Sequence, residues 1–426
     1  MGAMAKVAVI GAGYVGLTTA ACLAHLGHEV RCSDAEPERV EKLSKGQVPI
    51  VEDGLTELVR DGLRSGRLSF GSSNVWAAEG AGFVFLCVPT PQGPSGRADM
   101  SYIEDAASEI GPHLLPESIV VNKSTVPVGS TKVVERSLGR SDVDVVSNPE
   151  FLREGSAVHD FLHPDRIVIG AEDESVAIKV AGLFLRTSAP LVVTDPATAE
   201  TIKYASNAFL ATKVSFVNAI AALCEAVGAD VRQVVLGLGS DHRIGAEFLR
   251  PGPGWGGSCF PKDTMALVRI AEDAGYDFSL LKGVIDLNEE QYQRVAAKAE
   301  RLAGGSLSGR VVALWGLTFK ARTDDLRASP SLEVGSRLAA KGAKVQAYDP
   351  TVNGPLPGLD VRADPYAACE GASVLVVGTE WDEFRWLDFE KVASLMERPA
   401  VVDARNLLEP AALRRLGFFY EGIGLA

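Results

Sequence analysis

A cysteine that follows a glycine-rich turn is the residue of this sequence best suited to covalent chemistry. Cys259 comes after the stretch 252–257 and before a helical pattern of apolar residues from Met265 to Ala271. Glycines let backbone N–H groups approach a ligand, and a helix N-terminus favours the thiolate form of a cysteine. The sequence therefore predicts a nucleophilic thiol at a helix N-terminus.

The helix dipole alone does not make Cys259 a working nucleophile. It contributes roughly 0.3–1 kcal/mol, less than one pKa unit, and a thiol with a pKa of about 8.5 is only a few per cent ionised at pH 7. Lys262 or another cation must add to the effect. The alternative is a buried, inert cysteine in a tight turn, because cysteine is often buried.

The N-terminal stretch has the pattern of a dinucleotide-binding turn. An apolar strand, Lys6–Ile10, leads directly into Gly11, Gly13 and Gly16, a helical run follows, and a second strand ends at Asp34. This is G-x-G-x-x-G in its required setting, with a strand before it, a helix after it and an acid about 20 residues on. The glycines allow a pyrophosphate to lie on the helix N-terminus. Asp34 would hold both ribose hydroxyls and repel a 2′-phosphate, which favours NAD over NADP.

Polar residues also follow the later strands of the same predicted sheet. Ligands of such sheets bind beyond the carboxyl ends of the strands. Thr90 and Thr125 are therefore either site residues or plain turn residues. The strand-like runs are 82–88, 118–122 and 143–147, and the polar segments after them are Pro89-Thr90-Pro91, Lys123-Ser124-Thr125 and Asn148-Pro149-Glu150.

Two pairs of polar residues have helical spacing. Glu150 and Glu154 are four apart on an expected helix, and Lys203 and Asn207 are four apart on a long one, 196–228, so each pair shares a face. Each pair is either a solvated surface or part of a site. The long helix, of about 33 residues and about 50 Å, is typical of a domain link or a dimer seam.

The histidines and cysteines do not predict a metal site. His159 and His163 are four apart, but they lack the glutamate of H-E-x-x-H and run into Pro164, so we expect no zinc there. The six cysteines are scattered without a C-x-x-C pair, which indicates reduced thiols of the cytosol.

The opening strand–helix–strand pattern returns late in the chain. Arg310–Trp315 reads as a strand, Ser331–Lys341 as a helix, and a further strand ends at Asp349, without G-x-G-x-x-G. The cations Lys320 and Arg405 at expected strand ends suit a diphosphate. The fold class predicted is α/β, with two Rossmann-like, doubly wound parallel-sheet domains joined by a long central helix and a helical domain.

Charge and hydropathy exclude some partners. The formal net charge is −13, which argues against nucleic acid or an anionic membrane as a partner. No apolar run of the sequence reaches membrane-spanning length, and the N-terminus has no signal-peptide pattern. We therefore expect a cytoplasmic protein whose anionic ligand, if it has one, meets a local cluster of Lys and Arg.

These motifs together resemble the nucleotide-sugar 6-dehydrogenases, the UDP-glucose/GDP-mannose dehydrogenase family, nearly end to end. The Gly-Ser-Cys form is unlike the UDP-N-acetylmannosamine branch, where a histidine usually replaces the serine. The motifs that carry the resemblance are Val9–Gly16, Lys123–Pro127, Asn148–Gly155, Lys203–Asn207, Gly256–Asp263, and Phe319-Lys320 before Asp324–Arg327.

The resemblance implies a four-electron oxidation of a sugar 6-hydroxyl to a carboxylate, with two NAD and no metal. The substrate it implies first is UDP-glucose, giving UDP-glucuronate, with TDP-glucose or GDP-mannose as alternatives. Cys259 would hold the intermediate aldehyde as a thiohemiacetal and then as a thioester, which explains why a thiol is needed. The implied domains are 1–195 for NAD, 196–303 for the helical dimerisation domain with the cysteine loop, and 304–426 for the UDP-sugar.

The resemblance also implies residue roles. Lys203 and Asn207 would stabilise an oxyanion, Asp263 would act with a water as base, and Glu154 with Thr125 would position water for thioester hydrolysis. Arg243 would reach the substrate of a partner subunit, which implies a homodimer. The implied cofactor contacts are Gly11, Gly13, Tyr14, Val15, Gly16, Asp34, Arg39, Thr90, Thr125, Glu154, Lys262 and Arg327. The implied sugar-nucleotide contacts are Glu150, Phe151, Leu152, Arg153, Glu154, Lys203, Asn207, Arg243, Phe248, Leu249, Arg250, Pro251, Gly252, Gly256, Phe319, Lys320 and Arg405.

Two other classes of protein remain as alternatives. A 2-hydroxyacid or 6-phosphogluconate-type dehydrogenase also pairs a Rossmann domain with a helical one, but it makes one hydride transfer and needs no thiol. A non-catalytic nucleotide-sugar-binding protein on this fold would not need Cys259 at all.

Overall fold

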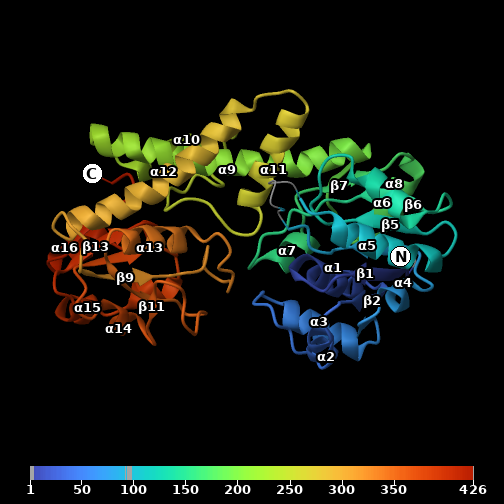
Figure 1. Cartoon of the computed structure of the whole chain (residues 1–426), viewed down its shortest axis with the longest axis horizontal. Coiled ribbons are helices and arrows are strands. Elements are labelled where there is room, and N and C mark those ends of the chain that lie inside the picture. Colours follow the sequence, from blue (N-terminus) through green and yellow to red (C-terminus); the bar gives the residue numbers. More distant parts are fainter. Residues whose placement is uncertain (1–3, 92, 94–97, 426) are drawn as a thin grey trace. The chain divides into compact units, whose positions relative to one another are not determined.

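The chain forms two compact α/β units, Met1–Ser206 and Asn207–Ala426. The computed structural model describes residues 4–91, 93 and 98–425 (Figure 1). Helix α9 (Pro196–Val227) begins in the first unit and continues into the second. Each unit has its own sheet, mostly parallel in the first unit and fully parallel in the second, and the predicted α/β fold class is confirmed.

The first sheet has eight strands in the order β3-β2-β1-β4-β5-β6-β7-β8. Its first six strands are parallel and follow the order 3-2-1-4-5-6 of dinucleotide-binding sheets, so the switch point lies between β1 and β4. β7 runs antiparallel to β6, a reversal that the sequence did not indicate. The strands are β1 (Lys6–Ile10), β2 (Glu29–Ser33), β3 (Leu68–Gly71), β4 (Phe83–Leu86), β5 (Ile119–Asn122), β6 (Asp144–Ser147), β7 (Ile167–Gly170) and β8 (Leu191–Thr194).

Helices cover both faces of the first sheet, because alternate residues of its strands are apolar on both sides. Val9 and Val121 pack in one core with α1 residues such as Leu17, whereas Ala8 and Val120 pack in another core with α5 and α6. The helices are α1 (Tyr14–His25), α2 (Pro37–Ser44), α3 (Leu55–Arg64), α4 (Asn74–Ala78), α5 (Ser101–Ile110), η1 (Gly111–His113), α6 (Ser130–Leu138), α7 (Ala157–Leu162), α8 (Glu174–Ala181) and η2 (Gly182–Phe184).

The second sheet repeats the same order in six parallel strands, β11-β10-β9-β12-β13-β14. Two cores cover its faces, one that includes α12 residues and one that includes Trp315 and Phe384. The strands are β9 (Val311–Trp315), β10 (Lys344–Tyr348), β11 (Asp360–Val361), β12 (Val374–Val377), β13 (Ala400–Asp403) and β14 (Phe419–Gly422). The helices that follow α9 are α10 (Val231–Gly239), α11 (Phe260–Asp273), α12 (Ser279–Leu302), α13 (Pro330–Ala340), α14 (Pro365–Cys369), η3 (Asp382–Trp386), α15 (Phe389–Leu395) and α16 (Pro410–Arg415).

The long helix predicted over 196–228 is confirmed as α9, of 32 residues. Asp195 begins it by accepting a hydrogen bond from the backbone N–H of Thr198 at 2.9 Å, with Pro196 at the first helical position. Gly228, with φ of +75°, ends it, as glycine commonly does in the left-handed region after a helix.

The helix expected over Glu150 and Glu154 is wrong. Residues 148–153 are extended or irregular, and α7 begins only at Ala157. The side chain of Glu150 accepts a hydrogen bond from the backbone N–H of Leu152 at 2.7 Å, and Gly155 has φ of +79°. Both features favour turns over a helix, so the two carboxylates do not share a helical face.

Candidate active site

The glycines of the first turn divide into packed and open positions. A Cβ on Gly16 would lie 1.8 Å from the carbonyl oxygen of Gly11, and Gly11 itself has φ of +97°. A Cβ on Gly13 would meet no protein atom within 4 Å. Gly13 immediately precedes α1, so the space in front of it adjoins the backbone N–H groups of a helix N-terminus. This arrangement fits the pyrophosphate of a dinucleotide.

Asp34 lies after β2 and holds the turn from beside it. Its Oδ2 accepts hydrogen bonds from the backbone N–H of Ala12 at 2.8 Å and from Arg39 at 3.1 Å, and its Oδ1 accepts from the backbone N–H of Glu36 at 2.9 Å. The structure thus brings together Asp34, Arg39 and the glycine turn, which the resemblance implies as cofactor contacts.

The polar segments after β4, β5 and β6 meet at one edge of the first sheet. The hydroxyl of Thr90 donates to the carbonyl oxygen of Thr125 at 2.7 Å. Lys123 donates to the side-chain oxygen of Asn148 at 3.1 Å. Burial lowers the pKa of Lys123 to about 8. Three separate segments therefore build this edge jointly, although hydrogen bonds of this kind serve a turn as well as a site.

Lys203 and Glu150 form a buried pair in the first unit. The Lys203 ammonium donates to both the carbonyl oxygen and the carboxylate Oε1 of Glu150, each at 2.7 Å. Burial by itself raises the pKa of Glu150, but the charge of Lys203 and its hydrogen bond outweigh this and hold that pKa below its ordinary value. Lys203 is 4% exposed, so it is not the solvated lysine that the sequence left open.

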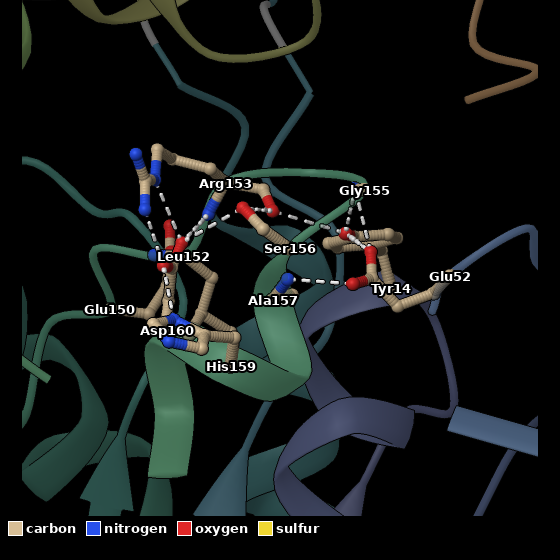
Figure 2. Close-up of polar contacts among 10 residues, drawn as sticks. All are labelled: Tyr14, Glu52, Glu150, Leu152, Arg153, Gly155, Ser156, Ala157, His159 and Asp160. Atoms are coloured by element: carbon tan, nitrogen blue, oxygen red, sulfur yellow. Dashed lines mark hydrogen bonds and ion pairs between the residues drawn. The ribbon is translucent and has the colours of Figure 1, made fainter. Parts of the chain in front are cut away.

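The segment after Glu150 is fixed by an ion pair. Arg153 donates to Asp160 through its side chain at 2.7 and 3.0 Å and through its backbone N–H at 2.9 Å (Figure 2). Beside it, the aromatic ring of Phe151 lies 3.7 Å from the guanidinium of Arg166. These contacts order the stretch that, by the resemblance, would contact the sugar nucleotide.

Glu52 is a buried acid at this edge that the sequence analysis missed. It lies between α2 and α3 and accepts hydrogen bonds from Tyr14 and from the backbone N–H groups of Gly155 and Ala157 (Figure 2). No local sequence pattern indicates this role, because its partners Gly155 and Ala157 are 103 and 105 residues away in the chain.

Cys259 lies at the N-terminus of α11, as predicted. It is the N-cap residue of that helix, and Pro261 lies in the first turn. Cys259 is partly exposed, whereas the other five cysteines, all thiols like it, are buried. The Ser258 hydroxyl lies 3.6 Å from its sulfur. The thiol is therefore placed where a helix dipole favours its ionised form and where an external electrophile can reach it.

Asp263, in the first turn of α11, joins two other predicted residues. Asn207 donates to its Oδ2 at 2.6 Å, and Lys262 pairs with its Oδ1 at 2.9 Å. Asp263 is fully buried. The ion pair neutralises part of the Lys262 charge, so the help that this lysine gives to a thiolate is smaller than the sequence suggested.

Buried side chains of α9 and α12 hold the glycine-rich loop before Cys259 at two points. At the first, Asn218 accepts from the backbone N–H of Gly252 at 2.8 Å, and Gln291 donates to its carbonyl oxygen at 2.7 Å.

At the second point, Asn288 accepts from the backbone N–H of Trp255 at 2.8 Å, and Tyr292 donates to the Trp255 carbonyl oxygen at 2.8 Å. The sequence analysis missed these residues. The spacing of Asn288, Gln291 and Tyr292 on a helix rich in apolar residues was the signal that could have found them.

The same loop lies against the second sheet domain. A Cβ on Gly256 would lie 1.9 Å from the carbonyl oxygen of Ala328, and one on Gly257 would lie 2.9 Å from the ring of Phe319. These positions require glycine for close packing. Arg405 donates to the carbonyl oxygens of Phe319 at 3.1 Å and Gly378 at 2.9 Å. The structure therefore brings Gly256, Phe319 and Arg405 into one neighbourhood.

The remaining predicted residues of the second unit lie on its surface loops or near them. Arg243 pairs with Asp241 at 2.5 Å and its side chain is 78% exposed. Arg327 pairs with Asp325 at 2.7 Å, and the Lys320 ammonium lies 5.5 Å from the Phe319 ring. In the stretch Phe248–Pro251, only Leu249 is buried. Within residues 4–91, 93 and 98–425, no group of three or more His, Cys, Asp or Glu could hold a metal ion.

The fold and the glycine turn define a class. A sheet of order 3-2-1-4-5-6 with an open glycine in front of a helix N-terminus, and an aspartate after the next strand, is typical of dinucleotide-binding dehydrogenases.

The chain belongs to the UDP-glucose/GDP-mannose dehydrogenase family. Residues 5–187 match the NAD binding domain of that family, residues 197–290 its central domain and residues 313–410 its UDP binding domain. The protein is therefore an NAD-dependent oxidoreductase, and the predicted family and cofactor are confirmed.

Individual relatives agree over almost the whole chain. The protein is 46% identical to a UDP-glucose 6-dehydrogenase of Pseudomonas aeruginosa, over 98% of this chain and 97% of that one. Among solved structures, it is similar to a UDP-glucose dehydrogenase from Pyrobaculum islandicum, with a TM-score of 0.92 and 39% identity over 100% of this chain and 99% of that one. A UDP-D-ManNAc dehydrogenase from Pyrococcus horikoshii matches with a TM-score of 0.88 and 27% identity, over 98% and 99% of the two chains.

Proposed function

We propose that the protein oxidises UDP-glucose to UDP-glucuronate in two NAD-dependent steps through a covalent intermediate on Cys259. The observation that carries the proposal is the thiol itself, partly exposed at the N-terminus of α11, on a loop that buried side chains hold in place. Two of the relatives named above, the UDP-glucose dehydrogenases at 46% and 39% identity, support the choice of sugar nucleotide.

NAD, when bound, supplies the oxidant for each of two steps. The first step converts the C6 alcohol to an aldehyde, to which the Cys259 thiol adds, with its proton passing to the aldehyde oxygen. The second step converts this thiohemiacetal to a thioester. Water then adds to the thioester carbonyl, the C–S bond breaks, and the carboxylate and the thiol are released.

The other proposed roles follow the contacts of each side chain. Lys203 and Asn207, one helical turn apart in α9, donate to the oxyanion that develops at C6. Asp263, held by Asn207 and Lys262, acts with a water as base. Glu154 and Thr125 position the water that hydrolyses the thioester.

The proposed ligand sites follow the predicted domains. The turn Gly11–Gly16 with Asp34 holds NAD within 1–195, and the loops that carry Lys320 and Arg405 hold the UDP diphosphate within 304–426. The helical domain 196–303 carries the cysteine loop. The other residues proposed to contact the ligands are those that the resemblance implies. They include Thr90, Lys262 and Arg327 for the cofactor and the segments 150–154 and 248–252 for the substrate.

A homodimer is part of the proposal. On α9, Phe209, Phe216 and Leu223 recur every seven residues and are 65%, 50% and 55% exposed. A stripe of this spacing is suited to packing against a second copy of the same helix. The exposed Arg243 would then be available to the substrate of the partner subunit.

We also propose that the enzyme is a soluble protein of the cytoplasm. Among the described residues, α9 is the one helix with the length and apolar composition to cross a membrane. Its buried Glu200 accepts hydrogen bonds from Gly129 and Thr131 of the first unit, and its Lys203 pairs with Glu150. These contacts hold the first turns of α9 against the first sheet domain.

The test is a Cys259→Ser variant assayed by NADH formed per UDP-glucose consumed. The wild type is expected to form about two NADH per sugar, because two oxidations occur on one molecule. Cys259→Ser should retain binding of NAD and UDP-glucose but lose acid formation by at least about 10³-fold, since no thioester can form.

Cys224→Ser is the matched control, since it removes another thiol of the second unit and should leave turnover unchanged. A wild-type ratio near one NADH per sugar would exclude the covalent scheme. The same assay with TDP-glucose and GDP-mannose tests the sugar nucleotide. If turnover is faster with either of them, that compound is the substrate in place of UDP-glucose.

A further inference from the structure

Tyr14, Glu52 and Gly155 form one hydrogen-bonded cluster from three distant parts of the first unit (Figure 2). Tyr14 is the first residue of α1, directly after the open Gly13. Gly155 directly follows Glu154, the residue proposed to position the hydrolytic water. The cluster therefore joins the glycine turn of the cofactor site to the segment that carries Glu154.

Glu52 is the acceptor at the centre of this cluster. Its Oε2 accepts from the backbone N–H of Gly155 at 2.6 Å and from the Tyr14 hydroxyl, and its Oε1 accepts from the backbone N–H of Ala157 at 2.7 Å. Glu52 is 8% exposed. A buried carboxylate with three donors aimed at it is strongly held, because charge-assisted hydrogen bonds are about twice as strong as neutral ones.

Tyr14 completes the cluster as a protonated phenol. Burial, and then the hydrogen bond to Glu52, raise the pKa of Tyr14 well above its ordinary value. Its hydroxyl can therefore donate to Glu52 while it accepts from the backbone N–H of Gly155 at 2.9 Å. The Tyr14 oxygen also lies 3.4 Å from the carbonyl oxygen of Arg153.

The backbone of Glu154 is consequently held on both sides. Before it, Arg153 is bound to Asp160 through its backbone N–H at 2.9 Å and through its guanidinium. After it, Gly155 is bound by Glu52 and Tyr14. Residues 153–157 have little freedom to shift without breaking these bonds.

We infer that Glu52 is a positioning residue that, through Gly155 and Tyr14, fixes the Glu154 segment relative to the glycine turn of the cofactor site. The inference rests on the proposed function for its catalytic consequence. Release of the thioester, in which water adds to the carbonyl carbon and the C–S bond breaks, is the step that should depend on Glu52. The two oxidations before it need Glu154 only as a ligand contact and not to position a water, so they should depend on Glu52 much less.

The test is Glu52→Gln, which keeps the size of the side chain but turns an NH₂ group towards donors. In rapid mixing with NAD and UDP-glucose, the variant should give a burst of about two NADH per site, followed by a steady state at least about tenfold slower than in the wild type. Intact-protein mass should show the sugar adduct on Cys259, and KM for NAD should change by less than about threefold.

Two further variants make the result specific. Glu57→Gln changes an exposed acid of the neighbouring α3 and should behave as the wild type. Tyr14→Phe leaves the two backbone bonds of Glu52 in place and should give the same burst with a smaller loss. If Glu52→Gln fails to fold, the Tyr14→Phe variant becomes the test. Steady turnover of Tyr14→Phe with no initial burst of NADH would overturn the inference.

Other outcomes separate the inference from the proposed function. Unchanged turnover in Glu52→Gln, or equal slowing of the burst and the steady state, would overturn the inference and leave the proposed function standing. A wild type that forms no NADH from UDP-glucose would overturn the proposed function. Hydrogen exchange at residues 153–157 then still tests the positioning, since faster exchange in Glu52→Gln than in Glu57→Gln supports it and equal exchange overturns it.

Discussion

Asp34 and Asp349 occupy the same topological position, directly after the second strand of each parallel sheet. The turns beside them also correspond. The backbone N–H of Gly11 donates to the carbonyl oxygen of Ser33 at 2.8 Å, and that of Gly316 donates to the carbonyl oxygen of Tyr348 at 2.7 Å. The two regions therefore share the same backbone arrangement and differ in their side chains.

The two aspartates differ in how many donors they already satisfy. Asp34 accepts from three groups among the described residues, the backbone N–H groups of Ala12 and Glu36 and the side chain of Arg39. Asp349 accepts from six, namely the backbone N–H groups of Leu317, Thr318 and Thr351, the hydroxyls of Thr318 and Thr351, and the indole of Trp381. A carboxylate offers about four lone-pair sites, so Asp34 keeps about one site for a ribose hydroxyl and Asp349 keeps none.

The turn beside Asp349 is also more fully occupied by protein groups than the turn beside Asp34. Thr318 stands where the first unit has Gly13, and its hydroxyl is bound to Asp349 at 3.1 Å. The helix that follows the first turn begins at Tyr14, whereas the helix that follows the second begins only at Pro330. The second turn thus lacks both the open space and the helix N-terminus that a pyrophosphate uses. This supports a different phosphate arrangement in the second sheet domain, with Lys320 and Arg405 as the cations.

The largest effect is expected at Asp349, because its role is structural. Asp349→Ala would leave the buried N–H groups of Leu317 and Thr318 without their acceptor, and we expect a loss of about 3–4 kcal/mol in unfolding free energy. Urea denaturation of the ligand-free protein measures it. The same substitution at Asp34 should cost less, about 1–2 kcal/mol, because it leaves one fully buried N–H group, that of Ala12, without its acceptor. Equal losses at the two sites would show that the aspartates are equivalent.

A smaller effect, and on binding rather than stability, is expected from making the first turn resemble the second. Gly13 has φ of −71°, which threonine adopts without strain, and a Cβ there meets no protein atom. Gly13→Thr should therefore fold normally but fill the space for the pyrophosphate, weakening NAD by about 30-fold, or about 2 kcal/mol. Calorimetric titration with NAD checks this. A loss of stability without a loss of NAD affinity would contradict it.

Local signals in the sequence were enough to predict most of the elements that this comparison uses. The G-x-G-x-x-G turn, the strand ending at Asp34, the start and end of α9 and the position of Cys259 before α11 each depend on residues close together in the chain. The second strand–helix–strand unit was visible for the same reason.

What the sequence could not show depends on distant contacts. The reversal of β7 is set by pairing between strands. Glu150 and Glu154 have helical spacing, but both lie before the first helical residue of α7. Glu52 and Asn288 act on backbone groups 103 and 33 residues away. Lys203 could not be separated from a surface lysine until its bond to Glu150, 53 residues away, was known.

The smallest effect on ligand affinity is expected at Asp34, which also holds the glycine turn. Asp34→Ala removes the acceptor for the ribose hydroxyls and the charge that repels a 2′-phosphate. NAD should bind about tenfold more weakly, or about 1.4 kcal/mol. The affinity for NADP should stay the same or increase, because Arg39 loses its carboxylate partner and becomes available to the 2′-phosphate. The ratio of kcat/KM with NAD to that with NADP measures this directly, and Glu36→Ala, an exposed acid that also pairs with Arg39, is the control. If the ratio is the same in Asp34→Ala as in the wild type, the remaining lone pair of Asp34 does not face the ribose, and Asp34 differs from Asp349 in packing alone.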